Sequence, residues 1–369
     1  MRVIVTGGGT GGHIYPALAI AERILAELPD SEVLYIGCDN GLENSIVPTT
    51  SIPFKTISAQ GLPRKLTPAL ARSLLVNSKG VVEARRYIKE FHPDLVIGTG
   101  GFVCGPTVLM ACMNHIPAMI HEQNAYPGMT NRLLAARVNK VMINYPEASR
   151  FFVKAKETVL TGLPVRNDIG KLSKEEGCEK FGLDPKKKTI LITGGSRGAR
   201  TINRVSALAL TGILANPEVQ VIFITGKVGY VETSLLIKDS DSSVLRDERL
   251  CFLEYTHDMP YALAAADVVV GRAGATFLAE IAVCGLPGIL VPYPYASDNH
   301  QQFNAQAVVD AGAGEMILDN ELTVPKLTAA LNNFLNDDEY YQAKKDAMFE
   351  LAKPAALDDI MMLVKSFEK

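Results

Sequence analysis

Residues 2–21 read RVIVTGGGTGGHIYPALAIA, and this stretch decides the fold. An uninterrupted apolar run ends in five glycines among the six residues 7–12, and apolar residues then recur at helical spacing. This order predicts a buried strand, a tight turn and a helix. Glycine lets the backbone approach a ligand closely, and the N–H groups and dipole of a helix N-terminus favour an anion. The turn is therefore predicted to hold a diphosphate.

His13 lies in the first turn of that predicted helix. The helix dipole disfavours a charged imidazolium there, so it favours a neutral ring that can accept a proton. A base beside a phosphate site indicates transfer chemistry rather than binding alone. A helix cap without a catalytic duty is the alternative interpretation of this histidine.

Composition narrows the class of protein. Of 369 residues, 47% are apolar and 21% are charged, which is typical of a folded globular protein long enough for two domains. A net charge of −3 gives no general case for nucleic-acid binding. Six scattered cysteines without a C-x-x-C pair suit reduced thiols in a cytoplasm. Met1 leads directly into a strand, so we expect no signal peptide, and no apolar run is long enough to span a bilayer.

The chain starts its fold twice. Residues 190–195, ILITGG, repeat the character of residues 3–8, VIVTGG, and each start opens an alternation of strands and helices. Such alternation predicts parallel sheets covered on both faces. We therefore predict an α/β protein with two Rossmann-like, doubly wound domains, residues 1–162 and 163–354, facing each other across a cleft. The last helix, about residues 355–369, could pack back on the first domain.

The second half carries its own ligand-binding candidates. TGGSRGAR at 193–200 and GRAGATFLAE at 271–280 each follow a strand and open a helix, and Glu280 could hold ribose hydroxyls. DNHQQFN at 298–304 is dense in amides, which offer the donors and acceptors that a sugar needs. Asp239 and Asp241 spell D-x-D, a metal–diphosphate motif, but they follow a helix rather than a strand, so we interpret them as a solvated loop and predict no metal site.

Two common nucleotide motifs fit poorly. Gly7-x-Gly9-x-x-Gly12 matches the dinucleotide fingerprint, but the nearest acidic residue at a strand end, Asp39, comes too late to hold the ribose. An oxidoreductase is therefore a weak alternative. The spelling G-x-x-x-x-G-K-[ST] is absent, which excludes a P-loop.

Seven motifs in order make the pattern specific: GGGTGGHIYPALAIA, TGGFVCGP, HEQNAYPGMTNRLLA, GLPVRNDI, LITGGSRGAR, GRAGATFLAE and VPYPYASDNHQQFNA. Together they resemble glycosyltransferase family 28, and in particular the bacterial N-acetylglucosaminyltransferases that convert lipid I to lipid II in peptidoglycan synthesis. The resemblance covers nearly the whole chain. It implies a GT-B fold, UDP-N-acetylglucosamine (UDP-GlcNAc) as donor, and inverting transfer to the 4-hydroxyl of the N-acetylmuramoyl unit on undecaprenyl diphosphate.

The resemblance also implies site residues. His13 would be the base, with Glu122 as a competitor that could instead orient its neighbours. The donor site would use Thr10, Gly11, Gly12, Asn124, Arg166, Ser196, Thr256, Ala275, Thr276, Phe277, Leu278, Ala279, Glu280, Gln301 and Gln302. The acceptor diphosphate would lie on Gly8, Gly9, Gly100 and Gly101. Leu163, Arg197 and Thr256 depart from the residues usual in the family, which affects the fine geometry of donor binding.

A basic segment suits a lipid-anchored acceptor. Residues 63–89 contain seven basic residues and a single acidic one, Glu83, and Leu66, Leu70, Leu74 and Val81 could form an apolar stripe among them. Basic residues contribute about 1 kcal/mol each near an anionic leaflet. We therefore predict peripheral docking on the cytoplasmic face of the cell membrane through Arg64, Lys65, Arg72, Lys79, Arg85 and Arg86. An ordinary amphipathic helix over the sheet is the alternative.

The resemblance implies no required cofactor, since UDP-GlcNAc is a substrate, and it leaves dependence on a divalent metal open. The partners implied are UDP-GlcNAc, the lipid I acceptor, the anionic membrane surface and a cell-wall synthesis or division complex, with no nucleic acid. Two other functions stay open at this stage. One is another UDP-sugar enzyme of the same fold, such as a UDP-GlcNAc 2-epimerase, and the other is a non-catalytic nucleotide-sugar binding protein.

Overall fold

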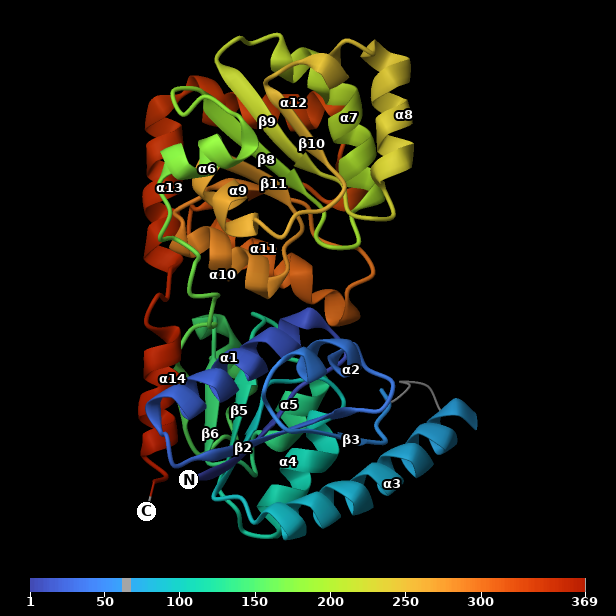
Figure 1. Cartoon of the computed structure of the whole chain (residues 1–369), viewed down its shortest axis with the longest axis vertical. Helices are drawn as coiled ribbons and strands as arrows, with labels where there is room; N and C mark the ends of the chain where they lie inside the picture. Colours follow the sequence, from blue (N-terminus) through green and yellow to red (C-terminus); the bar gives the residue numbers. More distant parts are fainter. Residues whose placement is uncertain (62–67, 369) are drawn as a thin grey trace. The chain divides into compact units, whose positions relative to one another are not determined.

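The computed structural model describes residues 1–61 and 68–368. The chain divides into two compact units, shown with their elements labelled in Figure 1. The first unit comprises Met1–Val165 together with Lys353–Lys369, and the second comprises Arg166–Ala352. The predicted boundaries lay after residues 162 and 354.

The first unit is built on a seven-stranded sheet in the order β3-β2-β1-β4-β5-β6-β7, with every neighbouring pair parallel. The order reverses between β1 and β4, so the loops that follow these two strands diverge at one edge and leave room for a ligand. The strands are β1 (Arg2–Thr6), β2 (Glu32–Cys38), β3 (Phe54–Ile57), β4 (Leu95–Gly98), β5 (Ala118–Glu122), β6 (Lys140–Ile143) and β7 (Thr158–Leu160).

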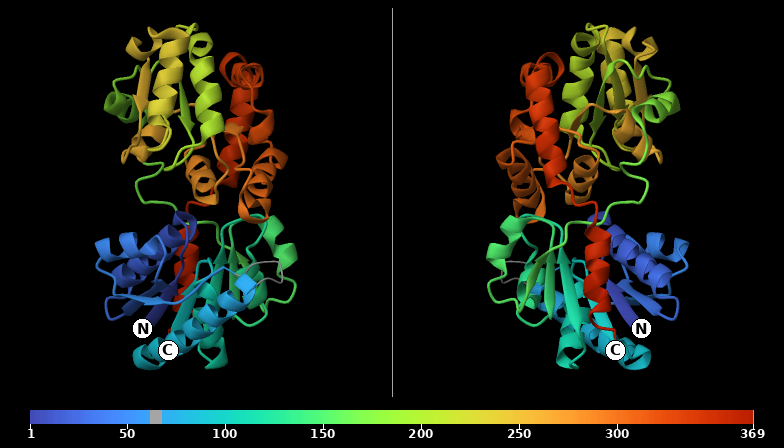
Figure 2. Two further views of the ribbon diagram at one scale, coloured as in Figure 1. Left: turned by 90° about the vertical axis from the view of Figure 1, so that its right-hand side faces the viewer. Right: turned by 90° about the vertical axis from the view of Figure 1, so that its left-hand side faces the viewer.

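Helices cover both faces of this sheet, as the side views in Figure 2 show. In β1, Val3 and Val5 belong to the core beneath α1 and α14, whereas Ile4 belongs to the core beneath α3 and α4, because successive strand residues point to opposite faces. The helical elements are α1 (Gly11–Glu27), α2 (Glu43–Ile46), η1 (Val47–Thr49), α3 (Pro68–Phe91), α4 (Cys104–Met113), α5 (Met129–Leu134), η2 (Pro146–Phe151) and α14 (Ala356–Lys365).

The last helix, α14, packs on the first unit beside α1. Ile360, Met361 and Val364 lie on one face of α14 and are buried in the same core as Val3 and Val5. Spacing of three and four residues brings these apolar side chains together. The sheet therefore gains a cover from the far end of the chain.

The second unit has a six-stranded sheet in the order β10-β9-β8-β11-β12-β13, also parallel throughout. Its order reverses between β8 and β11, which are the strands preceding the glycine turns at 194–198 and 272–274. The strands are β8 (Lys188–Thr193), β9 (Val219–Ile224), β10 (Leu250–Leu253), β11 (Val268–Gly271), β12 (Gly288–Leu290) and β13 (Gly314–Met316).

Its core lies mainly between this sheet and α7 and α12, while α6, α9 and α10 belong to the other side and α13 contacts both α10 and α12. The helical elements are α6 (Lys174–Phe181), α7 (Arg200–Leu214), α8 (Tyr230–Asp241), η3 (Val244–Arg246), α9 (Met259–Ala265), α10 (Ala275–Val283), η4 (Ser297–Asn299), α11 (His300–Asp310), η5 (Asp319–Glu321), α12 (Val324–Asn336) and α13 (Asp338–Leu351).

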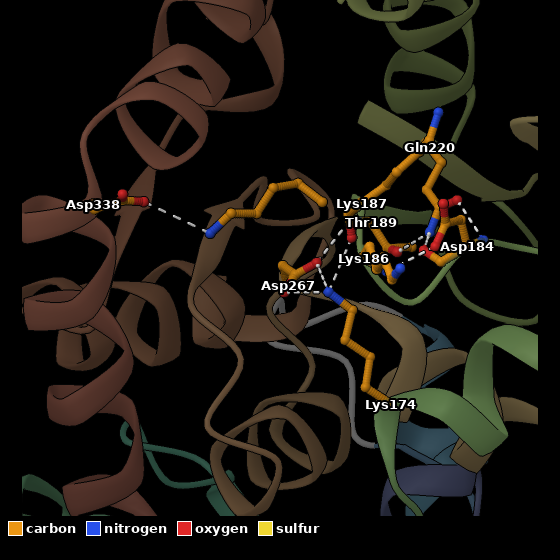
Figure 3. Close-up of polar contacts among 9 residues, drawn as sticks. Lys174, Asp184, Lys186, Lys187, Thr189, Gln220, Asp267 and Asp338 are labelled. Atoms are coloured by element: carbon orange, nitrogen blue, oxygen red, sulfur yellow. Dashed lines mark hydrogen bonds and ion pairs between the residues drawn. The ribbon is translucent and has the colours of Figure 1, made fainter. Parts of the chain in front are cut away.

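A polar network closes the amino ends of β8, β9 and β11 (Figure 3). Lys174 Nζ lies 2.9 and 2.8 Å from the two carboxylate oxygens of Asp267 and donates to the Lys187 carbonyl at 3.0 Å. The Thr189 N–H donates to Asp267 Oδ2 at 2.7 Å, and Gln220 Nε2 donates to Thr189 Oγ1 at 2.8 Å. These bonds attach α6 to the edge opposite the glycine turns, so we assign them a structural role.

The predicted fold class is confirmed in that both halves are parallel α/β sheets. Three details differ from expectation. No strand was predicted at β13, because a strand of only three residues next to glycines carries no detectable alternation. Asp239 and Asp241 lie in the last turn of α8, so the expected loop is wrong, although Asp239 is exposed as expected. Val81 packs against the core of the first unit rather than extending an exposed stripe.

Candidate functional site

Two glycine turns meet at the carboxyl edge of the first sheet. The Gly8 N–H donates to the Gly100 carbonyl at 3.3 Å. Gly101 has φ of +82°, and a Cβ there would lie 2.3 Å from the Gly8 carbonyl oxygen, so a side chain cannot be accommodated. Gly8, Gly9, Gly100 and Gly101, the residues predicted to hold the acceptor diphosphate, are therefore close together.

A buried carboxylate that sequence reasoning missed supports the first turn. Glu43 is fully buried and accepts the Gly9 N–H at 3.0 Å and the Cys38 N–H at 2.8 Å. A Cβ at Gly8 would lie 2.2 Å from its Oε1 atom. A lone glutamate in a polar segment gave no signal in the sequence, since its role depends on glycines far along the chain.

The hydrogen bonds within this turn limit which of its N–H groups can bind an anion. The N–H groups of Gly8 and Gly9 already donate to Gly100 and Glu43. The first N–H groups of a helix have no acceptor within the helix, and in α1 these belong to Gly11 and Gly12. A phosphate at this turn would therefore use the start of α1.

His13 is held from the side of its Nδ1 atom. Nδ1 lies 3.1 Å from the Thr99 carbonyl oxygen and 3.1 Å from Gln123 Oε1. A carbonyl oxygen can only accept, so Nδ1 carries the proton and Nε2 carries the lone pair in the neutral ring. The ring is close to Gly100, where a Cβ would lie 2.7 Å from Nδ1.

Glu122, the competing candidate base, is almost fully buried and strongly hydrogen-bonded. Its Oε1 atom accepts from the N–H of Asn124 at 3.0 Å and from Asn124 Nδ2 at 3.1 Å. Its Oε2 atom accepts from the Gly128 N–H at 3.0 Å and from Asn131 Nδ2 at 2.9 Å. Four donors on one carboxylate hold the loop from 123 to 131, and this geometry favours an orienting role for Glu122.

In the second unit, the loop after β8 is shaped by glycines. Gly195 and Gly198 have φ of +82° and +81°, and a Cβ at Gly198 would lie 2.1 Å from the Thr225 carbonyl oxygen. Ser196, the candidate phosphate donor, is exposed at the top of this loop. Because β8 pairs with β11, the loops at 194–199 and 272–274 leave adjacent strand ends.

Glu280 is the most perturbed carboxyl of this region. It lies in α10 with its side chain 12% exposed, and Arg166 Nε is 3.7 Å from its Oε1 atom. Burial raises the pKa of Glu280 to about 7, partly opposed by Arg166, while the charge of Asp168 adds to the rise. A carboxylate kept dry in this way is suited to accept hydrogen bonds from ligand hydroxyls.

The burial of the other residues of the 275–280 run follows helical spacing. Ala275 and Leu278 are buried in the unit, whereas Thr276, Phe277 and Ala279 are half-buried. Thr276 Oγ1 is buried and has no hydrogen-bond partner within residues 1–61 and 68–368. Such a group usually has a partner, so the start of α10 is a plausible contact for a ligand oxygen.

Gln301 lies next to this helix start. The side chain of Asn304 donates to the Ala273 carbonyl at 3.2 Å, which ties α11 to the turn before α10. Gln301 Oε1 accepts the Tyr293 N–H at 2.9 Å, and its Nε2 atom lies 4.0 Å from a Cβ placed on Gly274. Gln302 contacts Asn299 instead, as expected for neighbours on a helix that point in different directions.

The remaining predicted donor residues are distributed over both units. Thr10, Gly11, Gly12 and Asn124 belong to the first unit, at the start of α1 and after β5. Thr256 follows β10 in the second unit, where its hydroxyl accepts the Asp258 N–H at 2.9 Å before α9. Across the part of the chain that the structure describes, no group of three or more metal-ligating side chains gathers.

Comparisons with known proteins identify relatives along the whole chain. The model of the glycosyltransferase family 28 N-terminal domain matches residues 3–143, and the model of the C-terminal domain of that family matches residues 189–360. The two matches therefore fall on the two sheets described above.

Curated relatives share one name, UDP-N-acetylglucosamine–N-acetylmuramyl-(pentapeptide) pyrophosphoryl-undecaprenol N-acetylglucosamine transferase. That of Desulfitobacterium hafniense strain Y51 is 50% identical over 361 residues, 98% of this chain and 98% of the relative. That of Desulforamulus reducens is 43% identical over 365 residues, 99% of this chain and 98% of the relative. The crystal structure of Acinetobacter baumannii MurG is 28% identical, has a TM-score of 0.79 and covers 99% of both chains.

Proposed function

The chain belongs to glycosyltransferase family 28, and from that premise we propose that it transfers N-acetylglucosamine from UDP-GlcNAc to lipid I, giving lipid II. The acceptor group is the 4-hydroxyl of the N-acetylmuramoyl unit on undecaprenyl diphosphate. The observation that carries this proposal is full-length identity of 40–50% to relatives named for this transfer. That name also favours the transferase over the epimerase and the non-catalytic binding protein.

His13 is the proposed base. With its proton on Nδ1, the neutral ring presents a lone pair on Nε2 that can take the proton of the acceptor hydroxyl. The hydroxyl oxygen then attacks the anomeric carbon of the donor, and the bond from that carbon to the diphosphate oxygen breaks. The electron pair of that bond leaves with UDP, and attack from the face opposite the leaving group inverts the configuration at the anomeric carbon. Glu122 would maintain the loop beside the reacting groups.

UDP leaves as a stable anion, so it needs electrostatic support rather than a proton. In the second unit, the N-termini of α7 and α10 and the hydroxyl of Ser196 could contact its phosphates. Arg166 adds a positive charge, and Glu280 beside it would bind the ribose hydroxyls. Gln301, next to the start of α10, would meet the sugar hydroxyls. These groups supply the support without requiring a metal.

The exposed face of α3 is the proposed membrane-docking surface. Leu74, Leu75 and Val82 are 52%, 73% and 68% exposed, a large apolar exposure for one helix. Basic side chains flank them on the same helix, and the four predicted docking residues that the structure describes, Arg72, Lys79, Arg85 and Arg86, are all exposed. Arg64 and Lys65 lie outside the described residues. Within residues 1–61 and 68–368, no helix has the length and apolarity needed to cross a bilayer.

One assay tests the transfer. Radiolabelled UDP-GlcNAc is incubated with a soluble lipid I analogue, and both UDP release and the linkage in the product are measured. We expect one UDP per disaccharide and a β1→4 linkage. An epimerase would consume UDP-GlcNAc without the acceptor, and a binding protein would retain UDP without turnover, so either result would refute the proposal.

A further inference from the structure

Gln123 connects two histidines in the interior of the first unit. Its side chain is buried, with 2% of the residue exposed. Its Oε1 atom lies 3.1 Å from His13 Nδ1, and its Nε2 atom lies 3.2 Å from His121 Nδ1. His121 is fully buried on β5. Gln123 and His121 were not predicted as site residues, although both belong to the motif HEQNAYPGMTNRLLA.

The direction of every hydrogen bond in this chain is determined by its ends. His13 Nδ1 faces the Thr99 carbonyl at 3.1 Å, and His121 Nε2 faces the Gly162 carbonyl at 2.8 Å. Carbonyl oxygens only accept, so both ring nitrogens must donate. His121 Nδ1 is then an acceptor for one N–H of Gln123 Nε2, whose other N–H donates to the Thr99 carbonyl. The amide oxygen of Gln123 consequently faces the Nδ1 proton of His13, and the arrangement is self-consistent.

We propose that Gln123 and His121 are positioning residues that hold His13 in the tautomer with its proton on Nδ1 and its lone pair on Nε2. This inference rests on the proposed function, in which His13 Nε2 takes the proton of the acceptor hydroxyl. Neither residue touches the reacting atoms. They act by preventing the ring from rotating or from moving its proton to Nε2, where the base would be lost.

The ionisable groups around His13 are either kept neutral by burial or held in hydrogen bonds. Burial lowers the pKa of His121 to about 4, so its ring stays neutral. Burial raises the pKa of Cys104, which contacts Gly100, so its thiol stays neutral as well. The carboxylate of Glu122, on the same strand, is occupied by Asn124, Gly128 and Asn131. That of Glu43 accepts from Gly9 and Cys38.

The hydrogen-bonded chain ends at the Gly162 carbonyl, close to where the polypeptide passes from the first unit to the second. Gly162 lies just before the end of the first unit at Val165, and it has φ of +79°. A Cβ on Gly162 would lie 2.3 Å from the Cβ atom of Lys353, the residue at which the chain returns to that unit. The carbonyl that orients His121 is therefore fixed by close packing of both crossing segments.

The direct test is the tautomer of His13 in the intact protein. Histidine ¹⁵N chemical shifts are recorded on the full chain at neutral pH, and His13→Ala identifies the His13 signals among the six histidines. We expect Nδ1 to be protonated and Nε2 to have the shift of an unprotonated nitrogen, and the reverse for His121. A His13 ring protonated on Nε2 would overturn the proposal, whatever the enzyme's activity.

Kinetics of Gln123→Met and Gln123→Glu give the second test, with Gln342→Glu on the exposed face of α13 as the matched control. Gln123→Met should lower kcat about 10- to 100-fold, the range for partners that orient a histidine ligand, with KM for UDP-GlcNAc unchanged. Gln123→Glu places a carboxylate beside Nδ1–H and should move the acidic limb of the kcat profile up by about 1 to 3 pH units. Gln342→Glu should change neither quantity.

These outcomes separate the two proposals. Unchanged kcat in Gln123→Met, or a uniform loss in Gln123→Glu with an unmoved acidic limb, would overturn the positioning role. Full turnover of His13→Ala, or no GlcNAc transfer by the wild-type chain, would instead overturn the proposed function. The tautomer measurement on the wild-type chain needs no Gln123 variant to fold and no substrate to turn over.

Discussion

Glu280→Gln is the substitution that tests the donor site most sharply. In the free protein, burial raises the pKa of Glu280 to about 7, which places its titration near neutral pH. The ionised carboxylate offers both oxygens as acceptors to the two ribose hydroxyls, and its hydrogen bonds are stronger than those of the neutral acid. UDP should therefore bind better above pH 7 than below it. The glutamine variant has no charge to titrate, so this dependence should disappear.

The magnitude follows from the ionised fraction. With a pKa of about 7, roughly 10% of Glu280 is ionised at pH 6 and roughly 90% at pH 8. Apparent affinity scales with the competent fraction, so the wild-type Kd for UDP should fall by up to about 9-fold over this interval. UDP itself titrates in the same range, but this effect is common to both proteins. The ratio of wild-type to Glu280→Gln Kd values removes it.

Ionisation of Glu280 should strengthen UDP binding but lower the stability of the folded protein. The pKa of Glu280 rises on folding from 4.5 to about 7. Its contribution to the free energy of unfolding is therefore fully present below pH 4.5 and is lost as the pH rises through 7. A shift of this size corresponds to an upper limit of about 3 kcal/mol at pH 8. Glu280→Gln should therefore melt at a higher temperature than the wild type at pH 8, while binding UDP more weakly.

Isothermal titration calorimetry with UDP at pH 6, 7 and 8, together with thermal melts at pH 8, measures both effects. Glu339→Gln, an exposed position on α13, is the matched control and should behave as the wild type. Two results would refute the reasoning: a wild-type to variant Kd ratio that is constant with pH, or equal UDP affinity in both proteins at pH 8.

Four further predictions concern the other parts of the molecule. His13→Ala should keep UDP-GlcNAc affinity and lose roughly 100-fold or more in turnover, and unchanged turnover would remove it as the base. Transfer should persist in EDTA, since protein groups support the leaving diphosphate, and full loss restored by Mg²⁺ would contradict this. Lys174→Met removes the cation that contacts Asp267 and should lower the free energy of unfolding in urea by about 1.5 to 3 kcal/mol. An unchanged midpoint of urea unfolding would contradict a structural role for the network around Asp267. Charge reversal at Arg72, Arg85 and Arg86 on α3 should weaken binding to anionic vesicles at least ~100-fold, at about 1 kcal/mol per lost charge. Undiminished sedimentation with the vesicles would contradict the proposed docking surface.

Local patterns in the sequence were sufficient for the two sheets and the loops at their carboxyl edges. An apolar run followed by glycines, as in residues 3–8 and again in 190–195, indicates a buried strand and a tight turn because both properties depend on neighbours in the chain. The same locality placed His13 in the first turn of α1 and Glu280 inside α10. β13 was not predicted, because three residues are too few to show a period.

Tertiary structure decided how those residues are held. The bonds from His13 to Thr99 and Gln123 join positions 86 and 110 residues apart, and the bond from Gly9 to Glu43 spans 34. No periodic pattern encodes such pairs, because they depend on which strand ends the sheet order brings together. Packing also decided which face of α3 is exposed, since Ala84 and Ile88 draw Val81 toward the core and leave Val82 outside. The residue types that chemistry needs can thus be found from the sequence, whereas the tautomer and orientation of the base depend on contacts that only the folded chain creates.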